Sequence, residues 1–169
     1  MIRPILRYGD AALHTAARPV ERFDAALHGL LTDMTETMYA APGIGLAAPQ
    51  IGVPLRVCVI DVTVGKKSGE LHELVNPDTV LCEGMQLEEE GCLSLPGFNA
   101  TVVRPSRMVV TGFDRDGNPK TLEGTGLLAR ALQHELDHLE GAIFVDRLRG
   151  IKRDLIVRRV QKMRRSGKW

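Results

Sequence analysis

The amino-acid sequence predicts an α+β fold, in which antiparallel β-sheets surround a central helix. Three observations support this prediction: one helical pattern near the N-terminus, a series of short β-branched segments in the middle, and two helical patterns near the C-terminus. The chain has 169 residues, of which 44% are hydrophobic and 25% charged. This size and composition are typical of one globular unit, so residues 1–169 are expected to form a single domain.

The first helix is expected between Asp24, whose carboxylate can cap it, and Tyr39, after which Ala-Pro-Gly ends the pattern. Its larger apolar residues recur at helical spacing: Leu27, Leu30, Leu31, Met34 and Met38. Such a stripe is typical of a helix that packs against a core. We therefore expect this helix to support the fold and not to carry chemistry.

The middle of the chain is expected to be an antiparallel β region. The clearest strand pattern is LRVCVIDV, from Leu55 to Val62, and the segment from Gly65 to Gly69 has the composition of a hairpin loop. Further strands are expected at 71–75, 78–83, 85–90, 101–103, 107–113 and 119–122. The tripeptide DGN at 116–118 is a turn signal between the last two strands.

Two helices are expected after these strands. Thr125 can cap the first of them, which runs to Glu140 and ends at Gly141. The second, a basic C-terminal helix, is expected from about 151 to 165, with apolar side chains on one side: Ile151, Leu155, Ile156, Val160 and Met163. We expect it to lie on the body of the domain with its cations outward.

Charge is distributed unevenly along the chain. Residues 147–169 hold ten of the 22 Lys and Arg residues but one of the 21 Asp and Glu residues, which gives this tail a net charge of +9 and the rest of the chain −8. A basic tail on an acidic body can attract a polyanion such as RNA, or it can be a solvated helix surface. Both interpretations remain open.

No segment has the roughly 18 consecutive apolar residues of a membrane span, and the N-terminus MIRPILRYGD lacks the apolar centre of a signal peptide. The three cysteines, Cys58, Cys82 and Cys92, are too few and too irregular for a disulfide framework. We therefore expect a cytoplasmic protein with neither a membrane nor a DNA partner. Cys82 is expected to be a core residue, as free cysteines usually are.

The strongest chemical signal is the motif QHELDH at residues 133–138. His134 and His138 are four residues apart, so on a helix both imidazoles emerge from one face and can bind a single cation. Glu135 can reach water at that cation without being a ligand, as metal-assisted hydrolysis requires. Two histidines leave a cation under-coordinated, so a third protein ligand is expected, with one position left open.

Two residues compete for the role of third ligand. Asp146 lies downstream, where the large metallopeptidase families place theirs, whereas Cys92 lies upstream in the segment EGCLS, at the end of an expected strand. Thiolate is a strong ligand for zinc or ferrous iron, so Cys92 is preferred. A peptidase that uses Asp146 is the alternative, and it predicts that Cys92→Ala keeps both metal and activity.

The segment GIGLAAPQ, residues 43–50, is rich in glycine but does not fit a dinucleotide-binding loop. It follows a helix and not a strand, and Pro49 and Pro54 are incompatible with the helix whose N-terminus would hold a pyrophosphate. A functional interpretation remains: Gly43 and Gly45 let the backbone approach a substrate closely, while Gln50 offers an amide donor to a reacting oxygen. An ordinary Gly-Pro turn is the structural alternative.

Together, GIGLAAPQ, EGCLS and QHELDHLEG resemble, in this order and spacing, the three signature motifs of the peptide deformylases. The resemblance extends over essentially the whole chain, including the opening RPILRYGDAALHTAARPV. It implies an α+β fold and a metal-dependent hydrolase. The reaction that it implies is removal of the N-formyl group from the N-terminal formylmethionine of nascent polypeptides, which releases formate.

The resemblance also implies roles for individual residues. The implied metal ligands are Cys92, His134 and His138. Glu135 would be the acid and base, and Gln50 and the Leu93 N–H would contact the oxyanion. The implied ion is Fe²⁺, with Zn²⁺, Ni²⁺ or Co²⁺ as replacements, and a Cys/His/His set with an open position is compatible with each of them.

The substrate site that the resemblance implies is a methionine pocket. Its lining would be Ile44, Leu127, Arg130, Ala131 and His134, beside the two glycines of the loop. Two interpretations of Arg130 remain open: its stem borders the pocket while its guanidinium reaches solvent or the peptide backbone, or the residue is simply exposed at the surface. Arg104 is ambiguous in the same way. Asn99 stands where some members have a basic residue that helps hold the peptide, which leaves peptide affinity open. The basic C-terminal helix is implied to contact the ribosome.

A binding protein is the alternative from another functional class. It would be associated with the ribosome or with RNA and would keep the metal only as a structural ion. The intact Glu135 and Gln50 argue against this interpretation. A structural site would also be closed by a fourth protein ligand, for which the sequence offers no obvious candidate.

Overall fold

The computed structural model describes residues 1–169. It contains three α-helices: α1 (Ala25–Ala40), α2 (Gly126–Leu139) and α3 (Ile151–Arg165). Three short 3₁₀ helices are η1 (Ala11–His14), η2 (Ala48–Ile51) and η3 (Phe144–Arg147). The strands are β1 (Gly45–Ala47), β2 (Val57–Ile60), β3 (His72–Glu83), β4 (Gln86–Gly91), β5 (Asn99–Arg104), β6 (Arg107–Phe113) and β7 (Pro119–Thr125). The predicted α+β class is confirmed.

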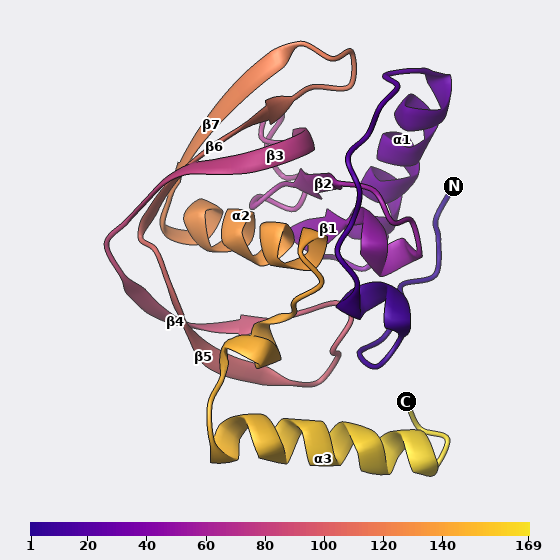
Figure 1. Ribbon diagram of the computed structural model, residues 1–169, viewed down its shortest axis with the longest axis vertical. Coiled ribbons are helices and arrows are strands. Elements are labelled where there is room, and N and C mark those ends of the chain that lie inside the picture. Colours follow the sequence, from indigo (N-terminus) through magenta and orange to yellow (C-terminus); the bar gives the residue numbers. More distant parts are fainter.

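The seven strands form two antiparallel sheets. The larger sheet has the strand order β1-β2-β3-β6-β7, and β4 and β5 form a two-stranded sheet of their own. Figure 1 shows α2 between the two sheets, with α1 beside β1 and β2 and with α3 on the far side of β4 and β5. The fold therefore surrounds one helix, as the sequence predicted.

Strand β2 explains how the larger sheet holds a helix on each face. Its four residues, VCVI, are all buried. Val57 and Val59 pack in the cluster that contains the apolar stripe of α1, whereas Cys58 and Ile60 pack in the cluster that contains α2. Alternate side chains of a strand point to opposite faces, so a short continuous apolar run is the pattern of a strand covered on both sides.

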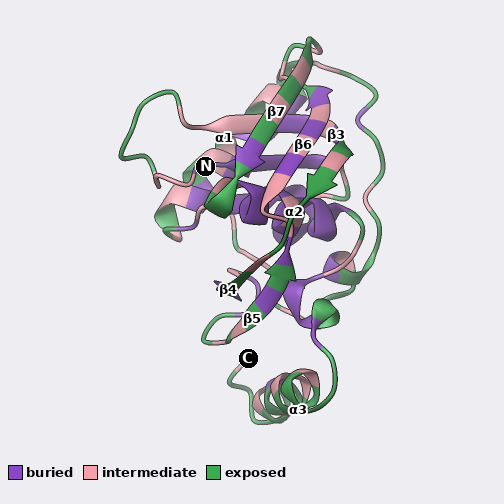
Figure 2. Ribbon diagram, turned by 90° about the vertical axis from the view of Figure 1, so that its left-hand side faces the viewer, coloured by how far each residue is buried: buried purple, intermediate pink, exposed green.

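Helix α2 is the most enclosed of the three α-helices. Every residue from Ala129 to Leu139 except Gln133 is buried, although five of these residues carry ionisable side chains. Figure 2 shows this helix buried between the two sheets, while α3 is largely exposed. Burying ionisable groups is costly unless they are paired, so their presence on α2 marks a site whose partners lie on neighbouring elements.

The helix boundaries agree with the prediction to within about one residue, but one cap differs. Asp24 caps α1, because its carboxylate accepts a hydrogen bond from the Leu27 N–H at 3.1 Å. Thr125 occupies the N-cap position of α2, yet its side chain makes no capping hydrogen bond. Thr125 is also the last residue of β7 and pairs with Arg107, so its conformation is that of a strand end.

Two predicted strands, 71–75 and 78–83, are one continuous strand, β3. The chain does not break at Asn76-Pro77, because β3 and β6 shift register between Val75 and Asp78. Asn76 adopts a positive φ of 50° there, and its side-chain amide bonds both the N–H and the C=O of Val20. A bulge accommodates a proline that lacks an N–H, so β3 continues past it.

The sequence did not predict β1, which lies inside the glycine-rich segment. Gly45, Leu46 and Ala47 pair with Ile60, Val59 and Cys58 of β2. No strand lies on the other side of β1, which makes it an edge of the larger sheet. Three residues that include a glycine are too short for a period-two pattern, so only the pairing with β2 defines this strand.

Helix α3 lies less closely on the body than predicted. Val160 is its one buried residue, and it joins a third cluster with Leu95, Val102 and Phe144. Ile151 and Leu155, which were expected on the packed face, are 75% and 61% exposed. This part of the prediction is wrong, because the apolar stripe of α3 is wider than the surface that the body offers it.

Cys82 was expected in the core and is exposed. It lies in the second half of β3, beyond the register shift between Thr79 and Leu81, where residues 78–83 are all exposed or half-buried. The general preference of free cysteine for buried positions therefore fails at this residue. None of the three α-helices combines the length and the apolarity that crossing a bilayer requires.

Candidate metal centre

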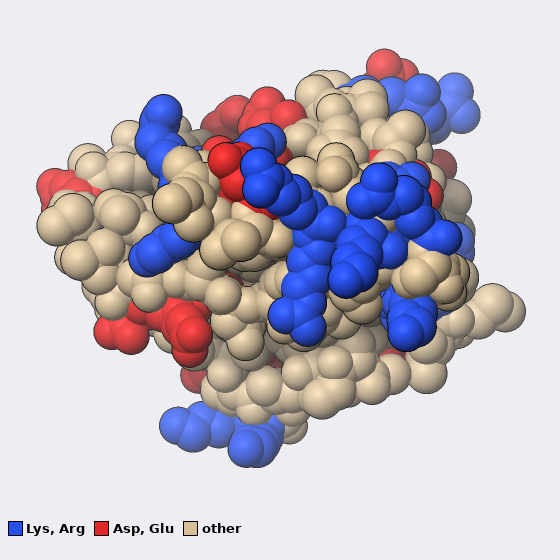
Figure 3. Space-filling model, turned by 90° about the horizontal axis from the view of Figure 1, so that it is seen from below, with Lys and Arg blue, Asp and Glu red and all other residues tan.

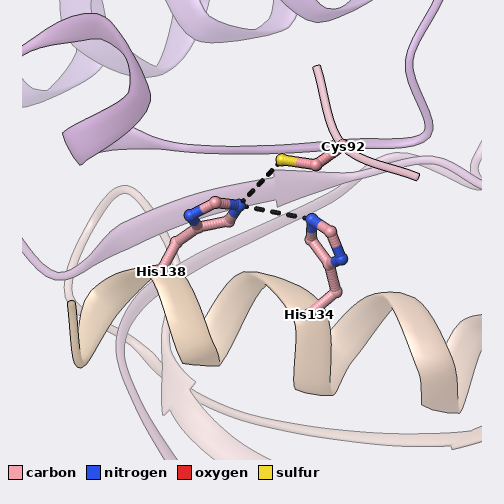
Figure 4. Close-up of side chains that lie close together, drawn as sticks. All are labelled: Cys92, His134 and His138. Atoms are coloured by element: carbon pink, nitrogen blue, oxygen red, sulfur yellow. Dashed lines mark hydrogen bonds between the residues drawn. The ribbon is translucent and has the colours of Figure 1, made fainter. Parts of the chain in front are cut away.

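Cys92, His134 and His138 bring their ligand atoms together in one cluster. The Cys92 Sγ lies 3.3 Å from the His138 Nε2, and the two histidine Nε2 atoms lie 3.2 Å apart. The histidines project from one face of α2, and Cys92 directly follows β4 (Figure 4). All three ligand atoms lie within 4.8 Å of one another, so one ion can contact all three.

Glu90 fixes the orientation of His134. Its Oε2 lies 2.6 Å from the His134 Nδ1, and both side chains are buried. A proton on Nδ1 leaves Nε2 free as the ligand atom, the usual arrangement of a metal-binding histidine. Burial by itself would raise the pKa of Glu90, but hydrogen bonds from His134 and Arg104 hold that pKa well below its usual value. Glu90 is therefore a carboxylate.

The chemistry of the donor set fits a divalent transition metal. Thiolate and imidazole suit zinc and ferrous iron, and three protein ligands leave a coordination position open. Burial lowers the pKa of His138, so its imidazole is neutral, which is the form that binds metal. Burial also opposes charge on His134, yet Cys92 and Glu90 raise its pKa, so this cluster favours a positive charge at its centre.

Glu135 lies beside the cluster and is nearly inaccessible to solvent. Its Oε2 has no hydrogen-bond partner in the protein, and burial raises its pKa to about 7. A β-carbon on Gly45 would lie 2.4 Å from the Glu135 Oε1, so the bare backbone of β1 is what makes room for this carboxylate. The glycine that was predicted to admit a substrate thus admits the Glu135 side chain.

Gln50 and Leu93 offer two hydrogen-bond donors at the same place. The Gln50 Oε1 accepts the Ala47 N–H at 2.9 Å, which turns its Nε2 toward Cys92 and Ser94, at 3.6 Å from the Sγ and 3.1 Å from the Oγ. The backbone N–H of Leu93 makes no hydrogen bond within the protein. Gly43 packs against the Leu93 side chain, where a β-carbon would lie 2.6 Å from Cδ1.

A cavity of about 360 Å³ opens on these groups. The predicted substrate-binding residues all line it: Gly43, Ile44, Gly45, Leu127, Arg130, Ala131 and His134. Gln50, Cys92, Leu93 and Glu135 line it as well. Leu127 is half exposed at its mouth. The structure therefore brings the predicted catalytic, metal-binding and substrate-binding residues around one space, except for His138, which does not line the cavity.

Arg130 and Arg104 are both buried, so neither of them is an exposed surface residue. Arg104 is fully buried and donates to Glu90 and Asp137. Arg130 is 4% exposed and donates to the Glu90 Oε1 at 2.9 Å and to the Val102 carbonyl at 3.0 Å. Both guanidinium groups donate to Glu90, the carboxylate that orients His134, so they stabilise the position of that carboxylate.

Asp146, the alternative third ligand, lies outside the cluster. Its carboxylate accepts the Ile143 N–H at 2.9 Å and caps η3, and the residue is exposed. The cluster contains Cys92 beside the two histidines and does not contain Asp146.

Two residues of this site, Glu90 and Asp137, were not predicted, and the contacts of Arg104 were not predicted either. Glu90 ends the expected strand 85–90, two residues before the ligand cysteine, and an acid at such a position is a local signal for a residue near the site. Asp137 lies between the two histidines on a helix that proved to be buried. Arg104 had no local signal, because its partners are 14 and 33 residues away in the sequence.

Comparison with known proteins decides the family. The sequence model of the polypeptide deformylases matches residues 2–154 of the chain. This chain belongs to the polypeptide deformylase family. A peptide deformylase of Acidobacterium capsulatum is 48% identical over 169 residues, covering 100% of this chain and 99% of the relative, and one of Acidothermus cellulolyticus is 49% identical over 166 residues, covering 98% and 89%.

Solved deformylases have the same fold. A peptide deformylase from Legionella pneumophila superposes with a TM-score of 0.91 at 48% identity, covering 99% of this chain and 98% of that chain. One from Synechococcus elongatus, in complex with actinonin, gives 0.89 at 37% identity and covers 94% and 88%. The chain is thus a hydrolase that removes formyl groups, and it belongs to a metal-dependent family. Its cluster of Cys92, His134 and His138 could hold a metal ion.

Proposed function

We propose that this deformylase removes the N-formyl group of formylmethionyl peptides at the cavity between β1, β4 and α2. The observation that carries the proposal is the position of Glu135, a buried carboxylate that opens on the same cavity as two of the ligands, Cys92 and His134. We place this activity in the cytoplasm, where nascent chains emerge. The proposed ligands are Cys92, His134 and His138.

A bound divalent cation would polarise the formyl oxygen and make water at the site more acidic. Glu135 takes the proton of that water and later gives it to the leaving amine, since a buried carboxylate with a pKa near neutrality can do both. The Gln50 amide and the Leu93 N–H then share the negative charge that develops on the formyl oxygen. The buried pair of Glu90 and His134 keeps the ligand imidazole in one orientation.

The first side chain of the peptide would enter the inner part of the cavity. Ile44 and Ala131 are apolar there, and Leu127 adds apolar surface at the mouth of the cavity, which suits an unbranched thioether. The peptide backbone would run along β1, whose free edge offers unpaired backbone groups beside the cavity. Asn99 supplies no charge for the peptide, so this backbone pairing carries the binding.

The native ion is proposed to be Fe²⁺. A ferrous ion beside the Cys92 thiolate is sensitive to oxidation, whereas zinc and nickel are not redox-active under the same conditions. Protein purified without oxygen and loaded with Fe²⁺ should lose activity in air, while the nickel-loaded protein should keep it. Equal stability of the two forms in air would contradict iron as the native ion.

Formate release from formyl-Met-Ala-Ser tests the function directly. Glu135→Gln should bind metal but release no formate, because it lacks the proton acceptor, and Cys92→Ala should lose most of its metal. Cys82→Ala is the matched control, since this exposed cysteine lies outside the cluster and should leave metal content and rate unchanged. A metal-loaded wild type that releases no formate would overturn the proposal and favour a binding protein with a structural ion.

The surface of α3 is proposed to contact the ribosome. Basic side chains gather over the lower face of the molecule (Figure 3), and on α3 they surround the exposed Leu155: Arg158, Arg159 and Lys162 line a shallow hollow with it. Ribosomal RNA is a polyanion that such a surface would bind in a salt-dependent way. Cosedimentation with ribosomes should weaken as salt rises and disappear when these three residues are changed to glutamate.

A further inference from the structure

An array of ion pairs continues from the metal ligand His134 through the protein to its surface. His134 bonds Glu90, Glu90 bonds Arg104 through two contacts, and Arg104 bonds Asp137 at 2.7 Å. Asp137 is then held by Arg147, whose Nε and Nη2 each donate to one carboxylate oxygen at 2.6 Å. The first four side chains are buried, and the Arg147 side chain is 41% exposed.

The geometry points to Arg147 as a positioning residue for the proposed metal site, acting on His134 through Asp137, Arg104 and Glu90. Arg147 is the last residue of η3, the short helix between α2 and α3, and it touches neither the ligand cluster nor the cavity. Its hydrogen-bonded route to the ligand cluster therefore begins at Asp137.

Arg147 fixes the orientation of Asp137 because a planar guanidinium binds both oxygens of a carboxylate at once. The Oδ2 of Asp137 is thereby aimed at Arg104, which in turn presents its other donors to Glu90. Without Arg147, Asp137 has one arginine instead of two and can rotate about its side-chain bonds. Arg104 would then divide its donors differently between the two carboxylates, and Glu90 would hold the His134 ring less firmly.

Buried ion pairs make such transmission effective. Asp137 and Glu90 lie in a region with little water, where a carboxylate that loses a partner is strongly destabilised and draws its remaining partner closer. Partners that hold a ligand histidine typically change metal affinity or activity about 10- to 100-fold when they are removed. Three residues, Asp137, Arg104 and Glu90, stand between Arg147 and His134 in the array. We therefore expect a smaller change in metal affinity or activity, about 3- to 10-fold.

The test compares Arg147→Met with Arg149→Met. Both substitutions remove one positive charge from the same segment before α3, but Arg149 is exposed and outside the array, so the pair separates positioning from a general loss of charge. The inference rests on the proposed function, and the first measurement is therefore cobalt binding and formate release by the wild type.

Three quantities are then measured on the cobalt-loaded variants: the rate at which a chelator removes the metal, the visible absorption of the cobalt ion, and kcat and KM for formyl-Met-Ala-Ser. Arg147→Met should lose cobalt about 3- to 10-fold faster than wild type, shift the cobalt absorption, and lower kcat with KM within about twofold. Arg149→Met should match wild type in all three. A change in thermal stability alone would not produce this combination.

A double-variant comparison shows the route. In a protein that already carries Asp137→Asn, Arg147→Met should add little to the rate of cobalt loss, because the step through Asp137 is already broken. If wild type binds cobalt and releases formate but Arg147→Met behaves like Arg149→Met, the role of Arg147 is wrong while the proposed function stands. If wild type binds no metal, both are wrong. Arg147→Lys replaces Arg147→Met if the latter does not fold, and it should lie between wild type and a full loss because lysine binds one oxygen only.

Discussion

At the scale of single residues, the site depends on one contact that a sequence cannot show. Gly45 was predicted to be functional because a glycine lets backbone approach a ligand, and its importance now has a physical cause within the protein. The Glu135 carboxylate lies where a β-carbon of residue 45 would be. The Glu135 carboxylate therefore packs directly against the backbone of the edge strand β1 at Gly45.

Gly45→Ala should displace the Glu135 carboxylate and lower kcat/KM for formyl-Met-Ala-Ser by about 100-fold or more, which is the usual contribution of a general base. Metal content should remain near one ion per chain, since Cys92, His134 and His138 are not displaced directly. The matched control is Gly29→Ala, where the added methyl group meets no atom within 4 Å. A Gly45→Ala enzyme with wild-type kcat/KM would contradict the proposed role of Glu135.

The raised pKa of Glu135 predicts how the metal-free protein responds to pH. Burial raises this pKa from 4.5 to about 7, so the folded state holds the proton more tightly than the unfolded state does. The stability that this provides is present below about pH 4.5 and is lost as pH rises through 7. The shift corresponds to about 3 kcal/mol of unfolding free energy.

Glu135→Gln should therefore become more stable relative to wild type as pH rises from 5 to 8, with a difference of up to about 3 kcal/mol at pH 8. Denaturant unfolding in the presence of a chelator measures this difference at each pH. The matched control for the loss of one carboxylate is Glu88→Gln at an exposed position of β4. A Glu135→Gln difference that does not change with pH would mean that Glu135 is ionised at little cost in the folded protein.

The same scale shows how much of the site a sequence can specify. His134, Glu135 and His138 could be predicted because helical spacing alone places them together, and Cys92 because a thiolate suits the same ion. Glu90, Arg104 and Asp137 could not be paired in advance, since their contacts join residues far apart in the sequence. Buried ion pairs depend on tertiary packing, which no local pattern encodes.

At the scale of elements, the predicted helices and most strands are found because their signals are local. Asp24 caps α1, and the apolar stripe of that helix is buried as expected. The differences occur where distant elements decide the outcome: β1 exists through its pairing with β2, and β3 continues through the bulges beside β6. The apolar stripe of α3 correctly predicted a helix, but part of the stripe is exposed and does not pack on the body.

Helix α1 contains a position that limits its stability without serving the site. Gly29 is exposed in the middle of the helix, and a β-carbon there meets nothing within 4 Å. Gly29→Ala should raise the unfolding free energy by about 0.5–1 kcal/mol, because alanine loses less backbone entropy in a helix. Denaturant unfolding measures the change, and a decrease in stability would contradict the packing described for α1.

At the scale of the whole molecule, the site lies where three parts of the fold meet. The edge strand β1 supplies Gly45 and leads to Gln50, the end of β4 supplies Glu90 and leads to Cys92, and α2 supplies the histidines and Glu135. Helix α2 is buried between both sheets, so groups from each sheet can reach it. The enclosed helix is thus the reason that residues from three distant segments converge on one cavity.

The distribution of charge follows the same division. The acidic body carries the catalytic cavity, whereas the basic tail forms α3 on the opposite side of the small sheet β4-β5. A peptide can therefore reach the cavity while α3 is bound to a polyanion, since the two surfaces belong to different elements. This separation is what the proposed contact between α3 and the ribosome requires.

The proposed site holds one metal ion with Cys92, His134 and His138 as its three protein ligands. X-ray absorption by the zinc-loaded protein tests this set of ligands. We predict one sulfur neighbour at about 2.3 Å and two histidine nitrogens at about 2.0–2.1 Å, with the sulfur absent from Cys92→Asp and present in Cys82→Ala. A wild-type spectrum without a sulfur neighbour would rule out Cys92 as a ligand. A sulfur neighbour that remains in Cys92→Asp would do the same.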